Sequence, residues 1–279
     1  MCKIITRMIS RVLYISTLVL TLLILGVSST VTENKGASFG YMGTHGPGEW
    51  GRLSPEYSEC AKGKLQSPLN IMKTKVVRSK IFKPLTRNYV PANATLCNNQ
   101  FNIGVKYEGD AGSMEVNGKT YSLKQMHWHS PSEHRLNGVR YPVELHLVHQ
   151  AEDLSLSVVA ILFNYSTPDP LLLKIKEKME ELSKEVCAGN EEAHVPLGIL
   201  DLKLLKKNTR KYYRYVGSLT TPPCYENVLW TVLGKVRSIS HEQVAAIKAP
   251  LKSDCKNNAR PCQPLNGRMV ELYEDLSRN

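Results

Sequence analysis

The chain has 279 residues, of which 42% are hydrophobic and 22% charged, and its formal net charge is +11. An excess of positive charge is one signature of nucleic-acid binding, but the basic residues are scattered, and no helix-turn-helix, zinc-finger or aromatic-basic motif accompanies them. We therefore expect a solvated basic surface and no nucleic-acid partner.

Residues 1–29 have the layout of a signal peptide. Three basic residues, Lys3, Arg7 and Arg11, precede an apolar run over 12–27, and two serines follow it. The run is short for a membrane-spanning helix, although an uncleaved signal anchor is the alternative. After cleavage near residue 29 the chain would carry a charge of 11 − 3 = +8. We expect a secreted protein with no stable membrane anchor.

Residues 30–279 are predicted to form one domain with a core at about 39–273. They are enough for one large core, and no internal repeat or low-complexity linker divides them. We expect mainly β-structure, because several segments are rich in β-branched and aromatic residues and are bounded by Gly, Asn or Pro. The predicted strands are Ile103–Tyr107, Lys119–Leu123, Val143–His149, Leu156–Phe163 and Val228–Val236.

One helix is clear, from Pro170 to about Val186. Asp169 can cap its N-terminus, and Pro170 fits its first turn. Apolar residues at helical spacing predict an ordinary core-facing stripe. They are Leu172, Ile175, Met179, Leu182 and Val186.

Two histidines one residue apart, His127 and His129, are the most informative feature of the chain. On a strand both side chains project from one face, while Met126 and Trp128 enter the opposite layer. A third histidine, His146, would come from a neighbouring strand, because residues 130–142 contain Gly and Pro and make a plausible returning loop. Three imidazoles leave a fourth tetrahedral position open, which is typical of catalytic zinc.

The alternative interpretation is that such a histidine pair is only polar surface. Glu144 argues against this, because it shares a face with His146 on a strand whose other residues are mostly apolar. A carboxylate and an imidazole buried side by side are costly unless each satisfies the other. Metal-bound histidines usually donate their second N–H to a neighbouring group, and Gln125 is also placed for that role. We interpret His134 and His149 as structural.

At this point the residues resemble a known family, the alpha-class carbonic anhydrases, and in detail their plant branch. The resemblance leaves out essentially the N-terminal leader. It is carried by eight motifs: Phe39-Gly40-Tyr41, Gly46-Pro47-Gly48-Glu49-Trp50, Gln66-Ser67-Pro68, Gln125–His129, Ser132-Glu133-His134, Glu144–His149, Gly217–Cys224 and Asn258-Ala259-Arg260-Pro261. It implies a large twisted, mostly antiparallel sheet with peripheral helices and zinc in a conical cleft. It also implies reversible hydration of carbon dioxide to bicarbonate and a proton.

The resemblance also assigns roles to residues. His127, His129 and His146 would hold Zn²⁺, with Gln125, Glu144 and a carbonyl near Asn258 orienting them. Thr220 would orient the attacking oxygen and pass its own proton to Glu133, and its backbone N–H would meet the substrate. Thr221 would also line the substrate site, although a threonine pair before two prolines is in isolation a rigid turn. An apolar wall for carbon dioxide would consist of Val148, Val158, Leu219, Val228 and Trp230, residues that also suit plain core packing.

One position departs from the family pattern. The usual proton shuttle is a histidine in an Asn-Gly-His type segment, and the matching stretch here places Phe101 at that position. A phenyl ring cannot carry a proton, so water chains past Tyr41 and Asn98, or buffer, would have to serve. We expect slowed proton transfer but intact zinc binding.

Six cysteines remain after the leader, an even number that suits an oxidising compartment. The resemblance implies a Cys60–Cys224 disulfide that braces the Thr220 loop. Cys255 and Cys262 are close enough in sequence to pair, while Cys97 and Cys187 could equally be inert buried thiols. Asn93 and Asn164 begin glycosylation sequons.

Two functional hypotheses follow. The first is a zinc-dependent carbonic anhydrase in the secretory pathway, in the apoplast or alternatively in the plastid. The second is a non-catalytic or weakly active storage or binding protein, since the plant branch also resembles yam tuber storage proteins. The complete set of three histidines with Glu133 and Thr220 favours the enzyme.

Overall fold

A computed structural model describes residues 38–205 and 209–276. The predicted signal peptide lies outside the described residues. None of the helices in the described part has the length and apolar character needed to cross a membrane.

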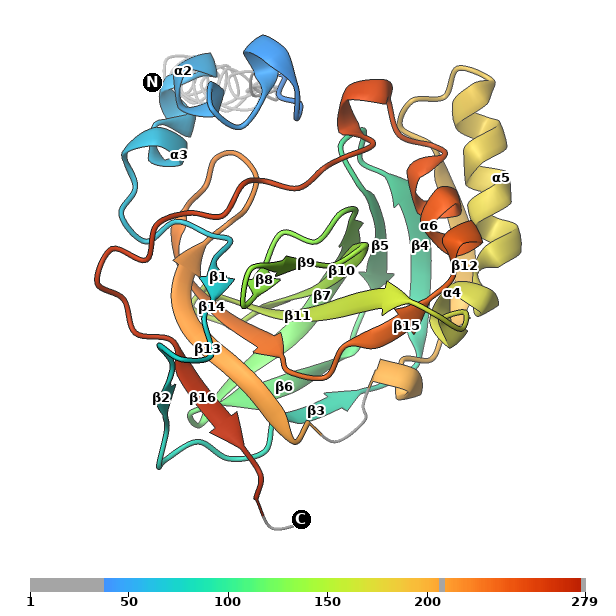
Figure 1. The fold of residues 1–279 in the computed structure, drawn as a ribbon. Coiled ribbons are helices and arrows are strands. Elements are labelled where there is room, and N and C mark those ends of the chain that lie inside the picture. The colour runs from blue at the N-terminus through green and yellow to red at the C-terminus, as the bar shows by residue number, and fades with distance from the viewer. Residues whose placement is uncertain (1–37, 206–208, 277–279) are drawn as a thin grey trace, which may run out of the picture. The chain divides into compact units, whose positions relative to one another are not determined.

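A large sheet dominates the fold, as the family resemblance implied (Figure 1). Among the described residues it has 13 strands, of which ten run in the order β12-β4-β5-β7-β10-β11-β14-β13-β16-β2, with β15 on β11 and the pair β3-β6 on β7. Most neighbours are antiparallel, the exceptions in this sheet being β11 with β14 and β15, and β16 with β2. A separate sheet has the order β1-β8-β9.

The strands are β1 (Asn70–Ile71), β2 (Val77–Arg78), β3 (Thr86–Tyr89), β4 (Ala92–Asn98), β5 (Ile103–Glu108), β6 (Gly112–Val116), β7 (Lys119–His129), β8 (Arg135–Leu136), β9 (Val139–Arg140), β10 (Val143–Gln150), β11 (Leu156–Tyr165), β12 (His194–Leu200), β13 (Lys211–Ser218), β14 (Glu226–Leu233), β15 (Arg237–Ile239) and β16 (Glu271–Glu274). The helices are α2 (Trp50–Leu53), α3 (Glu59–Lys62), α4 (Pro170–Lys174), α5 (Lys176–Cys187) and α6 (His241–Lys248). Helix α5 packs against β4 and β12, and α6 packs against α5 (Figure 1).

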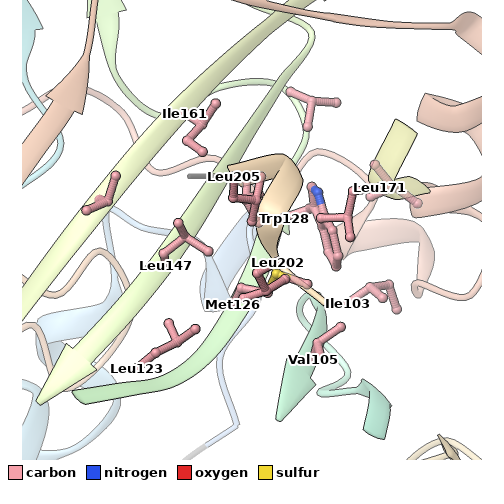
Figure 2. Close-up of a cluster of buried hydrophobic side chains, with 14 of the residues drawn as sticks. Ile103, Val105, Leu123, Met126, Trp128, Leu147, Ile161, Leu171, Leu202 and Leu205 are labelled. Atoms are coloured by element: carbon pink, nitrogen blue, oxygen red, sulfur yellow. The ribbon is translucent and has the colours of Figure 1, made fainter. Parts of the chain in front are cut away.

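The two faces of the central strands bury different sets of side chains, as the period of two along a strand requires. Met126 and Trp128 of β7 are fully buried in one core cluster, together with Leu147 of β10 and Ile161 of β11 (Figure 2). Val158 and Trp230 belong to a second cluster. The predicted opposite orientation of Met126 and Trp128 relative to the histidines is confirmed.

The predicted strands are present but differ at their ends. The segment predicted at Lys119–Leu123 is the first half of β7, which continues to His129. The segment predicted at Val228–Val236 ends at Leu233, and the chain then enters β15. The predicted returning loop contains the hairpin β8–β9, whose turn residues Asn137 and Gly138 have φ of 50° and 81°. Such a pair of positive φ values suits an Asn-Gly turn.

The prediction of one continuous helix over Pro170–Val186 was wrong. Ile175 has φ −106° and ψ 10° and separates α4 from α5. Its side chain is nonetheless buried, as are Leu172, Met179 and Leu182, so the apolar stripe stays on the core across the break. Asp169 caps α4 as predicted, with its Oδ1 accepting the amide N–H of Leu171 at 2.9 Å.

Candidate metal centre

Two adjacent strands bring the three predicted ligands together. His127 on β7 lies directly opposite His146 on β10, and His129 lies two residues further along the same face of β7. The ring centroids of the three imidazoles are 4.7–5.1 Å apart. One ligand nitrogen from each ring lies within 4.8 Å of the other two.

Hydrogen bonds fix which nitrogen of each ring faces the centre. His127 Nδ1 is 2.8 Å from Gln125 Oε1, and His129 Nδ1 is 2.6 Å from the carbonyl oxygen of Asn258. His146 uses its other nitrogen, Nε2, which is 2.7 Å from Glu144 Oε1. This leaves Nε2 of His127, Nε2 of His129 and Nδ1 of His146 as the three convergent lone pairs. The structure thus brings together the three predicted ligands and their three predicted partners.

The donor set fits a zinc ion. His129 Nε2 is buried and has no hydrogen-bond partner among the described residues, an arrangement that is costly without a ligand. Burial lowers the pKa of His127 well below its usual 6.5, and the neighbouring histidines lower it further. Burial likewise lowers the pKa of His129. Neutral imidazoles are the form that binds zinc.

Glu144 is the centre of a buried hydrogen-bond network behind His146. Its Oε2 accepts the backbone N–H groups of Glu133 and His134, and its Oε1 pairs with both His134 Nδ1 and His146 Nε2. Burial on its own would raise the pKa of Glu144, but His134 and His146 hold it well below its usual value. The carboxylate therefore stays ionised and holds the His146 ring in one orientation.

The two histidines interpreted as structural have that role. His134 Nε2 is 2.7 Å from the hydroxyl of Tyr215, so its second nitrogen is satisfied too. His149 lies between the hydroxyl of Tyr89 and the carbonyl of Ser157. His134, Glu144 and His146 also have metal-ligand spacing, but their mutual hydrogen bonds account for it.

Glu133 is held by a residue whose role the sequence did not reveal. Arg260 donates its backbone N–H to Glu133 Oε1 at 2.9 Å, and its buried guanidinium donates to Gln66 Oε1 and to the carbonyl oxygens of Ser67 and Cys60. Glu133 Oε2 lies 3.6 Å from His129 Nε2 and has no hydrogen-bond partner in the described part of the chain. The position of Arg260 in the Asn258–Pro261 motif was the only available signal.

The loop with the predicted catalytic threonine is braced by a disulfide, as predicted. Cys60 in α3 is bonded to Cys224, whose backbone N–H donates to the carbonyl of Thr221 at 2.9 Å. Thr220 is buried, at 5% exposure. Its hydroxyl makes no hydrogen bond to Glu133 in the described structure, so that bond stays a prediction.

The five residues of the predicted apolar wall lie in or against one core cluster on the histidine side of the sheet. Val158 pairs with Val148 on one neighbour and with Trp230 on the other, and the Trp230 ring centroid is 4.8 Å from that of His146. Val228 belongs to the same cluster, and Leu219 packs against it. These residues therefore pack in the core and also form an apolar surface beside His146.

Phe101 lies in an aromatic group formed with the N-terminal segment. Its ring centroid is 4.8 Å from that of Phe39, which also contacts Tyr41 and Trp50. The Phe101 carbonyl accepts a hydrogen bond from Asn258 Nδ2 at 2.8 Å. Asn258 also supplies the carbonyl oxygen that orients His129, so Phe101 is joined to the metal centre through this residue. The side chain at the expected shuttle position is therefore packed and cannot titrate.

The other four cysteines of the described residues are free. Proximity in sequence does not pair Cys255 with Cys262, which are buried and half-buried. Cys97 is buried as expected, but the expectation of a buried thiol was wrong for Cys187, which is exposed near the C-terminal end of α5. The sequon residues Asn93 and Asn164 both have exposed side chains.

Comparison with known proteins gives one consistent result. The family model for eukaryotic-type carbonic anhydrase matches residues 45–274. Alpha carbonic anhydrase 7 of Arabidopsis thaliana is 42% identical over 231 residues, covering 83% of this chain and 82% of that protein. Dioscorin DB3S of Dioscorea polystachya is 37% identical over 263 residues, covering 94% and 96%. A solved structure of dioscorin complexed with ascorbate has a TM-score of 0.82 and 38% identity, and covers 86% of this chain and 99% of that one.

Proposed function

The chain belongs to the eukaryotic-type carbonic anhydrase family, and on that premise we propose that it is a zinc-dependent enzyme that catalyses the reversible hydration of carbon dioxide to bicarbonate and a proton. The observation that carries the proposal is the convergence of three imidazole nitrogens, each on a ring whose other nitrogen has a polar partner.

The ligands would be His127 through Nε2, His129 through Nε2 and His146 through Nδ1. Zinc supplies a Lewis acid that lowers the pKa of a water molecule, so that a nucleophile is available near neutral pH. Gln125, Glu144 and the carbonyl of Asn258 hold the three rings in fixed orientations before the metal binds.

The residues around the ligands would bind and orient the reactants. Carbon dioxide is apolar and would lie against Val148, Val158 and Trp230, beside His146. The Thr220 hydroxyl would accept a hydrogen bond from the attacking water and donate its own proton to Glu133 Oε2, the buried acceptor that has no other partner in the described chain. Arg260 fixes the other oxygen of that carboxylate.

The test combines metal analysis of the purified mature protein with stopped-flow hydration of carbon dioxide. We expect about one zinc per chain, and we expect His146→Ala to lose both zinc and activity while the far-UV circular dichroism is preserved. His194→Ala is the matched control, because His194 is an exposed histidine on β12. Equal zinc content and equal activity in the His146→Ala protein would overturn the proposal.

The alternative is a non-catalytic or weakly active storage or binding protein. It is supported by the similarity to dioscorin DB3S, which is 37% identical over 94% of this chain. The same experiment separates the two. A protein that folds, contains no zinc and does not hydrate carbon dioxide would support the alternative.

We also propose that the protein is exported through the secretory pathway to the apoplast, with the plastid as the alternative destination. The Cys60–Cys224 disulfide suits an oxidising compartment, and Asn93 and Asn164 are exposed for glycosylation. Expression of a C-terminal fluorescent fusion and glycosidase digestion of the extracted protein test this. A cytosolic signal with no mass shift on digestion would contradict it.

A further inference from the structure

A cavity of about 830 Å³ lies where β14 ends, between the start of β13 and β15. One of its lining residues, Ile161, is opposite Leu145 on β10, whereas His146 is opposite the neighbouring Ala160. Side chains alternate between faces along a strand, so Ile161 projects from the face of the sheet opposite to His146. The cavity is therefore separate from the metal centre.

The lining of this cavity is strongly basic. Five basic residues and one acidic residue line it, namely Arg87, Arg210, Lys211, Lys235, Arg237 and Asp169. Arg87 is 7% exposed, and it donates to the hydroxyl of the buried Thr209 at 2.9 Å. Burial lowers the pKa of Arg87, and the positive charge of Arg237 lowers it further. Two guanidinium groups thus repel each other at the wall of one cavity.

Carboxylates compensate part of this charge. Asp169 accepts from Arg237 at 2.6 Å and uses its other oxygen to cap α4, while Lys211 pairs with Glu274 at 2.7 Å. In the described part of the chain, no salt bridge joins Arg210 or Lys235 to a carboxylate. The net charge of the lining therefore remains positive, which raises the local concentration of anions.

Much of the rest of the lining is apolar, beside the hydroxyl residues Thr167, Thr209 and Ser238. Ile161 and Leu205, which lie in the core cluster of Figure 2, contribute to it, together with Leu233 and two prolines, Pro168 and Pro170. A volume of several hundred Å³ with an apolar floor and a few charged groups is the usual form of a small-molecule site. Arginine is also the side chain best suited to hold a phosphate or similar oxyanion.

From this combination we propose that the cavity binds a small organic anion, with a phosphate-type group held by Arg87, Arg210 and Lys235 and a compact apolar body against Ile161 and Leu233. The site is independent of the metal centre, and its occupation does not require the proposed carbonic anhydrase activity.

Calorimetric titration of the zinc-loaded protein with phenyl phosphate, inorganic phosphate and phenol tests the proposal. We expect phenyl phosphate to bind more tightly than either of the other two probes, because only it supplies both halves of the ligand. Amide chemical shifts should change at Gly234 and Lys235 and stay constant at Thr220 and Thr221. Equal affinity for inorganic phosphate, no binding of phenyl phosphate, or shifts confined to the Thr220 loop would each overturn it.

Substitutions test whether binding of phenyl phosphate depends on the basic residues of the cavity. Arg210→Gln combined with Lys235→Gln changes two exposed side chains and should weaken phenyl phosphate binding about tenfold or more, the usual effect of losing hydrogen bonds to a charged group. The control, Lys62→Gln combined with Lys256→Gln, removes the same net charge at exposed positions outside the cavity lining and should leave the Kd nearly unchanged. Equal weakening in both proteins would reduce the effect to overall charge and contradict the proposal. Arg87→Met should abolish binding of phenyl phosphate. If the Arg87→Met protein does not fold, the double variant Arg210→Gln/Lys235→Gln tests the proposal without it.

Discussion

At the scale of one residue, Phe101 is the position where a single side chain is expected to limit the rate of the proposed reaction. The phenyl ring packs against Phe39 and offers no titratable nitrogen at the position where the resembling family places its proton shuttle. The ligands and their hydrogen bonds do not involve this ring. Its influence should therefore be confined to proton transfer.

The prediction is that Phe101→His raises the maximal rate of carbon dioxide hydration, most clearly in weak buffer. Positioned acid–base groups typically contribute about 10²–10⁴-fold when proton transfer limits the rate, and a histidine without its native surroundings should recover less. Stopped-flow rates at several buffer concentrations are the measurement. Phe101→Leu, which also lacks a titratable group, is the matched control.

Concentrated imidazole buffer should accelerate the unsubstituted protein in the same way. If neither imidazole nor the histidine variant increases the rate, proton transfer does not limit turnover, and this part of the interpretation fails.

His149 gives a second prediction at the scale of one residue, concerning pH and stability. Burial lowers its pKa from the usual 6.5 to about 3, so the unfolded chain binds a proton at a pH where the folded chain does not. Its contribution to stability is complete above pH 6.5 and is lost as the pH falls towards 3. For one such group the free energy of unfolding falls by about 1.4 kcal/mol per pH unit in this window.

Urea unfolding at pH 7, 6 and 5 measures this slope. His149→Gln should reduce the slope, although it lowers stability at pH 7 because the bonds to Tyr89 and Ser157 are altered. His194→Gln, a change at an exposed position, should leave the slope unchanged. A slope in the His149→Gln protein equal to that of the original would show that His149 does not cause the acid sensitivity.

Among the elements, the disulfide between α3 and the loop before β14 has the clearest expected effect. Cys60 and Cys224 are 164 residues apart, so the bond closes a long loop in the unfolded chain. Replacing both by Ser should lower the free energy of unfolding by about 2–4 kcal/mol. Chemical denaturation measures it, and Cys187→Ser, which removes an exposed free thiol, is the control.

This change should also affect the site, because Gln66 donates to the Cys224 carbonyl and also accepts from Arg260, which holds Glu133. We expect lower hydration activity at unchanged zinc content. Unchanged stability together with unchanged activity in the double variant would argue against a bracing role.

For the whole molecule, the question is whether zinc is needed for the fold. The ligands lie on β7 and β10 in the middle of a sheet of 13 strands, and each ring is held by a hydrogen bond within the protein. Removing zinc should therefore leave the far-UV circular dichroism unchanged but lower the Tm, because zinc binds the folded state in preference to the unfolded chain.

Dialysis against a chelator, followed by thermal melts with and without added zinc, measures this effect. Calcium at the same concentration is the control ion, because it prefers oxygen ligands. Loss of the β-sheet spectrum on chelation would mean that zinc is part of the folding core and that the ligands are not pre-organised.

The sequence by itself determined the features that depend on local spacing. The period of two along a strand placed His127 and His129 on one face and Met126 and Trp128 on the other, and the capping preference of Asp169 located the start of α4. Resemblance added the disulfide and the partners of the three rings, because those residues stand in recognisable motifs.

Only the tertiary structure decided the features that join distant parts of the chain. The bond from Arg260 to Glu133 spans 127 residues, and the basic cavity combines β3, β11 and the ends of β13 and β14. The helix also divides at Ile175, although the spacing of its apolar residues is compatible with one continuous helix. The physical reason is that periodicity and capping are properties of neighbouring residues, whereas burial and pairing of charges depend on which segments the sheet brings side by side.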